Sequence, residues 1–96
     1  MSQHPFLPQA DSLTRISREA LSSADESSFI DAAETCVLTR LQTLRIFGGL
    51  PQQKRPLSEE ERISRLKSLL SYWANGCPFV IDEQLFADVA NRRRRA

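Results

Sequence analysis

The sequence has few of the residues on which most metal and catalytic sites depend. It has one histidine, His4, and two cysteines, Cys36 and Cys77, which cannot supply the usual four ligands of a structural zinc site. His4 lies near the N-terminus directly before Pro5, in a segment expected to be a loose arm, where nothing is expected to hold an imidazole in a catalytic position. Neither cysteine has a histidine in an ordered segment to activate it. We therefore expect no metal, no cofactor and no enzymatic activity.

The chain also lacks a phosphate-binding loop. Its three glycines include the adjacent pair Gly48 and Gly49, and neither G-x-G-x-x-G nor G-x-x-x-x-G-K-[ST] occurs. The glutamates at 59–61 are the only dense acidic group. Their place at a predicted helix start is typical of charges that complement the helix dipole rather than of a metal or acid–base site.

Long hydrophobic runs are missing as well. The longest, Cys77–Ile81, has only a few residues, whereas a membrane-spanning helix needs about 20. The N-terminus has neither the basic region nor the apolar region of a secretory signal. We therefore expect a cytoplasmic protein without membrane contact, whose two cysteines are reduced thiols.

What remains is the composition of an ordinary globular chain. The 96 residues are 41% hydrophobic and 26% charged, which fits one small domain. The formal net charge of +1 hides an asymmetry, because residues 1–91 contain all 12 acids and nine of the 13 bases. The body is thus mildly acidic and residues 92–96 form a basic tail.

Residues 1–11 contain two prolines and predict a flexible arm. A weak helix is expected from Asp11 or Ser12, because apolar residues then recur at intervals of three and four. Within the arm, Phe6 and Leu7 resemble a linear motif that anchors in a groove of a partner protein. The alternative is a disordered arm without a binding role.

A long central helix is the strongest element of the first half. It is predicted to begin at Ser27 or Ser28, with Asp31 in its first turn, and to end at the glycines 48–49. Its apolar arc covers nearly half of the cylinder and includes Cys36 at one edge. A face this wide predicts packing against more than one neighbour, and it would also serve as the seam of a homodimer.

The third helix carries the clearest local signal. Ser58 and Glu61 form a capping box, in which each side chain satisfies the backbone N–H of the other residue. Glu61 and Arg65 are spaced for an i,i+4 ion pair. The helix is expected to end at Asn75–Gly76. Its apolar face comprises Ile63, Leu66, Leu69, Leu70 and Trp73.

The last third of the chain is predicted to be a connector and a short helix. Cys77–Ile81 is an apolar connector, since no second strand-like run is present to pair with it. Asp82 is expected to cap the last helix, whose buried part ends near Ala90. The apolar residues of this region either complete the core or form a docking patch. The sequence thus predicts an all-α single domain over residues 12–91, with three to four helices and a hinge at 48–57.

Basic residues supply candidate nucleic-acid contacts. These are the tail residues Arg92, Arg93, Arg94 and Arg95 and the linker residues Lys54 and Arg55. Such side chains hold phosphates with salt-sensitive affinity. A standard helix-turn-helix is excluded, because the connector is too long and Asp82 and Glu83 would repel phosphate. The alternative for the tail is complementation of the last helix dipole.

Candidate protein contacts are Tyr72, Arg65, Phe6 and Leu7. Tyr72 lies away from the apolar face of the third helix, beside Arg65, and this pair is typical of interface anchors. We therefore expect a small intracellular, non-enzymatic regulator or adaptor that binds a larger protein, such as a modulator or inhibitor of a host DNA-processing or transcription machine. Nucleic-acid binding through the tail is the first alternative, and a structural helical homo-oligomer is the second.

Overall fold

The computed structural model describes residues 7–44 and 55–95, and at 7–11 and 93–95 it describes the backbone without the side chains. This part of the chain forms four helices: α1 (Leu7–Leu21), α2 (Glu26–Leu44), α3 (Glu59–Ala74) and α4 (Glu83–Arg95). The prediction of an all-α domain with three to four helices is confirmed.

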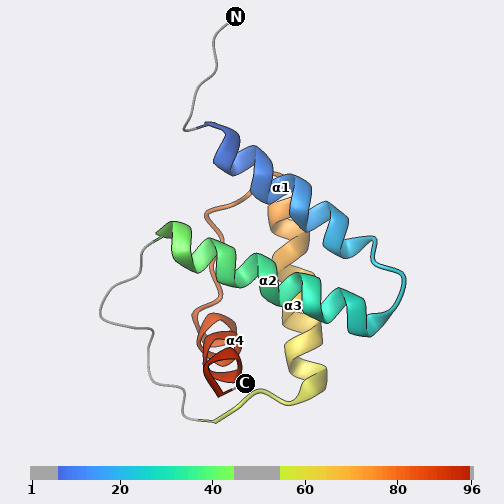
Figure 1. Ribbon diagram of the computed structural model, residues 1–96, viewed down its shortest axis with the longest axis vertical. Helices are drawn as coiled ribbons and strands as arrows, with labels where there is room; N and C mark the ends of the chain where they lie inside the picture. The colour runs from blue at the N-terminus through green and yellow to red at the C-terminus, as the bar shows by residue number, and fades with distance from the viewer. Residues whose placement is uncertain (1–6, 45–54, 96) are drawn as a thin grey trace, which may run out of the picture.

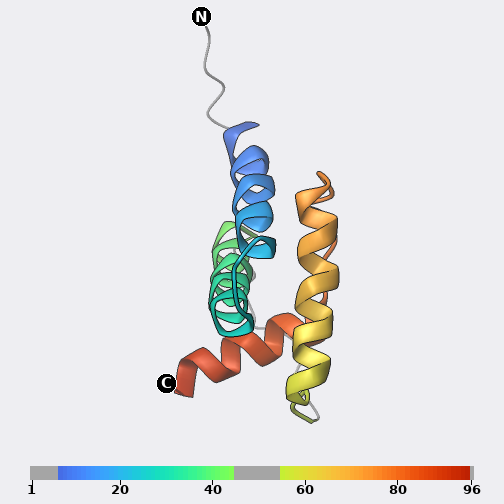
Figure 2. The same ribbon diagram turned by 90° about the vertical axis from the view of Figure 1, so that its right-hand side faces the viewer.

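The four helices form two layers closed at one end (Figures 1 and 2). In one layer α1 and α2 make an antiparallel hairpin, and α3 lies across them in the second layer. Figure 2 shows α4 running from the base of α3 to beneath α2. Because α2 contacts α1, α3 and α4, the prediction that it has more than one neighbour is confirmed.

The first helix begins earlier than predicted. It starts at Leu7 rather than at Asp11 or Ser12, so the expected arm over residues 1–11 was too long. Pro8 lies in the first turn, where a helix N–H has no partner within the helix to lose, and proline is tolerated there. The side chain of Leu7 and all of Phe6 are outside the described residues.

The second helix also begins before the predicted residue. It starts at Glu26, because the carboxylate Oδ1 of Asp25 accepts the backbone N–H of Ser28 at 2.7 Å and caps the helix. Asp31 is therefore beyond the first turn. The predicted end at 48–49 lies outside the described residues.

The caps predicted for the last two helices are confirmed. Ser58 Oγ accepts the N–H of Glu61 at 3.2 Å, and a carboxylate oxygen of Glu61 accepts the N–H of Ser58 at 3.0 Å. Asp82 Oδ1 accepts the N–H of Leu85 at 3.1 Å at the start of α4. Gly76 ends α3 with a φ of 85°, a left-handed conformation that glycine adopts without strain.

The core lies between the four helices, and α1 contributes Leu13 and Ala20 to it. Trp73 of α3 is fully buried and makes an edge-to-face contact with Phe86 of α4, with ring centroids 6.1 Å apart. On α2, Ala33 and Val37 are fully buried. This part of the face considered as an oligomer seam packs within the chain, and Leu41 and Leu44 further along it are partly buried. Burial on α4 ends near Ala90, as predicted.

Candidate functional site

The segment between α3 and α4, residues 75–82, is an irregular connector that folds back beside α3 (Figure 1). It contains no strand, which confirms the sequence prediction. Three arginines, one from each of the first three helices, hold this segment and the end of α3. Arg18 Nε donates to Ala74 O at 3.0 Å, Arg40 Nη2 donates to Pro78 O at 2.9 Å, and Arg65 Nη1 binds both oxygens of Asp82 at 2.9 and 3.1 Å.

Two further hydrogen bonds join the connector to the last residues of α3. The indole Nε1 of Trp73 donates to the carbonyl of Val80 at 2.9 Å, and the N–H of Cys77 donates to the carbonyl of Tyr72 at 2.9 Å. Because Trp73 is fully buried, the Val80 end of the connector is tied to the centre of the core. The backbone of the connector is therefore well determined.

Phe79 stands out against this anchored backbone. Its side chain is 75% exposed, although the carbonyls on both sides of it, at Pro78 and Val80, accept hydrogen bonds from the body of the protein. The sequence left open whether the apolar residues of this region complete the core or form a docking patch, and the structure divides them between the core and the surface. Trp73, Leu85 and Phe86 complete the core, whereas Phe79 and Ile81 remain at the surface.

Tyr72 and Arg65 border the same segment. Tyr72 is 54% exposed, as the sequence predicts, and it lies seven residues after Arg65, on the same side of α3. Arg65 reaches the end of the connector through Asp82. We refer to Arg65, Tyr72, Phe79 and Ile81 together as the connector face.

The predicted ion pair between Glu61 and Arg65 is wrong. Arg65 pairs with Asp82, and Glu61 instead binds Arg55 through two hydrogen bonds of 3.1 Å. The tertiary fold offers Arg65 a carboxylate that also caps α4, so a single guanidinium supports both the connector and the helix start. The predicted Glu61–Arg65 pair rested only on the four-residue spacing within one helix, which carries no information about Asp82.

The hydrogen bonds from Arg55, and then that from the Ser58 backbone, lower the pKa of Glu61 from its ordinary value of 4.5 to about 2. A carboxyl with a depressed pKa in the folded state stabilises it above its unfolded pKa and loses this contribution as the pH falls towards the folded value. We therefore expect Glu61→Gln to lower the thermal unfolding midpoint at neutral pH, with a difference from the wild type that shrinks between about pH 4.5 and 2. Glu60→Gln, which leaves the capping box intact, is the control. A Glu61→Gln effect that is constant with pH would contradict the assignment.

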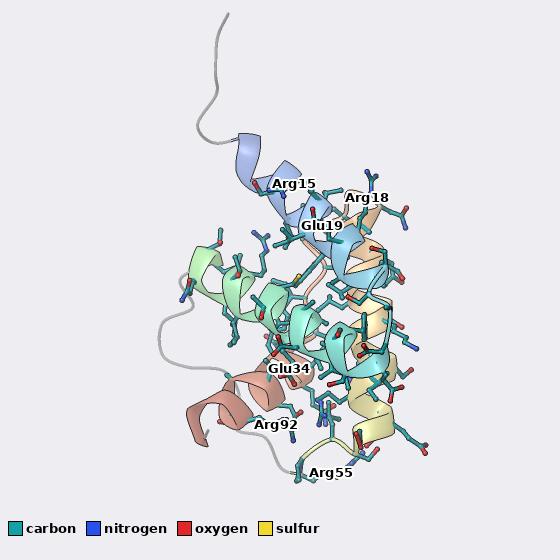
Figure 3. The ribbon with its side chains drawn as sticks, turned by 45° about the vertical axis from the view of Figure 1, so that its right-hand side comes forward. Arg15, Arg18, Glu19, Glu34, Arg55 and Arg92 are labelled. Carbon is teal, nitrogen blue, oxygen red and sulfur yellow. The ribbon has the colours of Figure 1, made fainter. Side chains whose placement is uncertain are left out.

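Sequence reasoning missed a buried ionic cluster where α4 meets α2 and α3. Glu34 is 7% exposed; its Oε2 lies 3.5 Å from Nε of Arg62 and 3.8 Å from Nε of Arg92, which Figure 3 shows facing it across the two helices. Asp88, also buried, accepts the N–H of Leu57 at 3.4 Å. The sequence contained one sign of this cluster, because these charged residues fall on the apolar stripes of their helices.

The basic residues considered for nucleic-acid binding do not form one described site. Arg92 faces Glu34 (Figure 3), and Arg55 is engaged by Glu61. The backbone of α4 continues to Arg95, so residues 92–95 of the predicted basic tail belong to this helix. Lys54 and the side chains of residues 93–95 lie outside the described residues.

The cysteines behave as predicted for core and connector positions. Cys36 is buried, and burial, together with the charge of Glu19, raises the pKa of its thiol to about 11, so that it stays protonated at neutral pH. Cys77 is half-buried. Within residues 7–44 and 55–95, no three histidine, cysteine or acidic side chains are grouped as metal ligands, and no helix has the length and hydropathy to cross a bilayer.

Comparisons with protein-family models, with curated proteins and with solved structures find no match to this chain. Its function is therefore argued from the chemistry and geometry of its own residues.

Proposed function

We propose that this protein is a small non-enzymatic regulator or adaptor that binds a larger protein through the connector face. The observation that carries the proposal is the exposure of Phe79 on a backbone held at both neighbouring carbonyls. An aromatic ring left in water forgoes the hydrophobic free energy of burial, which a partner can supply. A backbone that is already fixed loses little entropy on binding.

The composition of the connector face supports the same interpretation. Tyr72 near the end of α3 and Ile81 on the connector are exposed like Phe79, and Arg65 is held at the end of the connector by Asp82. Tyrosine, phenylalanine and arginine are enriched at protein–protein interfaces, where a few buried anchors supply most of the binding free energy. The Phe6–Leu7 motif, outside the described side chains, stays a prediction of a second contact. We propose further that the protein acts in the cytoplasm, as a modulator or inhibitor of a host DNA-processing or transcription machine.

The test is the substitution Phe79→Ala. We expect it to weaken partner binding by about tenfold or more, because anchor residues of this kind contribute about 2 kcal/mol or more. Leu21→Ala is the matched control, since Leu21 is also an exposed large apolar residue but lies at the end of α1. Binding is measured by affinity capture from a lysate of the source cells treated with nuclease, and folding by circular dichroism. Unchanged capture by Phe79→Ala would refute the proposal.

Nucleic-acid binding is a second candidate, favoured by one observation. The α4 backbone carries four consecutive arginine positions to its C-terminal end, and consecutive positions of a helix are about 100° apart, so the run is not confined to one side of the helix. Replacing Arg93, Arg94 and Arg95 by glutamine leaves the Arg92–Glu34 contact in place. If phosphate binding is the function, this variant loses retention on an oligonucleotide column and most of the salt dependence of that retention. Retention equal to the wild type would exclude this candidate.

A further inference from the structure

Two of the three arginines that hold the connector, Arg18 and Arg40, form no ion pair with a carboxylate of the described residues. Arg18 and Arg40 donate to main-chain carbonyls rather than to carboxylates, and none of the ion pairs among the described residues involves either of them. Arg18 uses only its Nε–H on Ala74 O, and its side chain is exposed beside the end of α3 (Figure 3). Both of its terminal amino groups are therefore available as a planar pair of donors, which suits a carboxylate.

Most acidic residues lie away from this surface. Asp25, Glu26 and Asp31 belong to the opposite end of α2 from Arg40, and the glutamates 59–61 begin α3, at the other end from the start of the connector (Figure 1). Among the acids whose side chains the structure describes, the nearer ones are Glu19, which pairs with Arg15, and Asp82 and Glu83, which follow the connector and of which Asp82 pairs with Arg65. The side chain of Asp11, on α1, is outside the described residues. Arg18 and Arg40 therefore give the region around residues 74–80 a positive surface, because no described carboxylate pairs with either of them.

We propose that Phe79 of the connector face, together with Arg18 and Arg40, which hold the connector, recognises an acidic segment of the partner protein. Carboxylates of that segment pair with Arg18 and Arg40, and an apolar side chain between them packs on Phe79. The inference rests on the proposed function and specifies the chemistry of the partner. A short acidic segment meets only the positive surface, whereas a long nucleic acid would also meet the acidic remainder of the body, so charge complementarity favours the protein segment.

The experiment uses the full chain with the photo-crosslinking residue p-benzoylphenylalanine in place of Phe79 and, as a control, in place of exposed Ser27 on α2. After irradiation in a nuclease-treated lysate of the source cells, the partner peptide attached at position 79 is sequenced by mass spectrometry. We expect an attached segment rich in aspartate and glutamate. A neutral or basic segment would overturn the acidic partner while leaving the proposed function intact. No cross-link above that from position 27, or a cross-link to nucleic acid alone, would overturn both.

Charge variants test the same inference by affinity. Arg18→Gln is expected to weaken binding of the identified partner about three- to fivefold and to reduce its salt dependence, as is typical of a partly exposed ion pair. Arg18→Lys, which keeps the charge, retains the salt dependence. Arg15→Gln, on the same helix but paired with Glu19 at 3.6 Å, is the matched control and leaves both unchanged. Equal binding by Arg18→Gln and the wild type at every salt concentration would overturn the acidic partner.

Discussion

Replacing Trp73 by alanine is expected to destabilise the protein by about 3–5 kcal/mol, the range for large aromatic side chains removed from a core. Trp73 is fully buried and packs edge-to-face on Phe86. Its removal leaves a cavity between α3 and α4 and deprives the Val80 carbonyl of its donor at 2.9 Å. A domain of this size has a total stability of about 5–14 kcal/mol, so the loss is a large fraction of it.

The measurement is urea unfolding followed by far-ultraviolet circular dichroism, because the variant lacks the only tryptophan of the chain. Tyr72→Ala is the matched control on the same helix, and we expect it to cost less than about 1 kcal/mol because exposed substitutions usually do. Trp73→Phe keeps a ring and removes the indole donor, and its cost should fall between the two. A Trp73→Ala cost as small as that of Tyr72→Ala would contradict the central place of this residue in the core.

Replacing Arg62 by methionine is expected to cost about 3–5 kcal/mol, as when one member of a buried ion pair is removed. Arg62 is 6% exposed and Glu34 is 7% exposed, with 3.5 Å between the paired atoms. The substitution removes the nearer positive charge from the Glu34 carboxylate. Arg92 approaches this carboxylate only to 3.8 Å, and its own side chain is 52% exposed. The apolar volume of methionine fills much of the vacated space, so the cost comes mainly from the charge.

The double variant Glu34→Met with Arg62→Met separates charge from packing. It is expected to recover most of the stability lost in Arg62→Met, because an apolar pair of similar volume avoids the desolvation of both ions. A double-mutant cycle on Arg15 and Glu19, whose side chains are 65% and 64% exposed, should give an interaction free energy below about 0.5 kcal/mol. If the double variant is no more stable than Arg62→Met, the assignment of the cost to the loss of the Arg62 charge beside Glu34 is wrong.

The candidate site was only partly predictable. The exposure of Tyr72 followed from its position opposite the apolar stripe of α3, and the connector followed from an apolar run without a strand partner. The exposure of Phe79 and the burial of Trp73 did not, because the apolar residues of this region could either complete the core or form a docking patch. Which of them enters the core depends on the path of the connector, and Arg40 sets that path from 38 residues away.

The sequence by itself determined the elements whose stabilising contacts are local. The capping box of Ser58 and Glu61 and the cap at Asp82 each act over three residues, so their spacing could be recognised directly. Only the tertiary structure decided the partners of the charged residues. Arg65 has Glu61 four residues away and binds Asp82 instead. Helix crossing brings that carboxylate to a half-buried position, where the Coulomb attraction between the two charges is stronger than at the exposed helix surface.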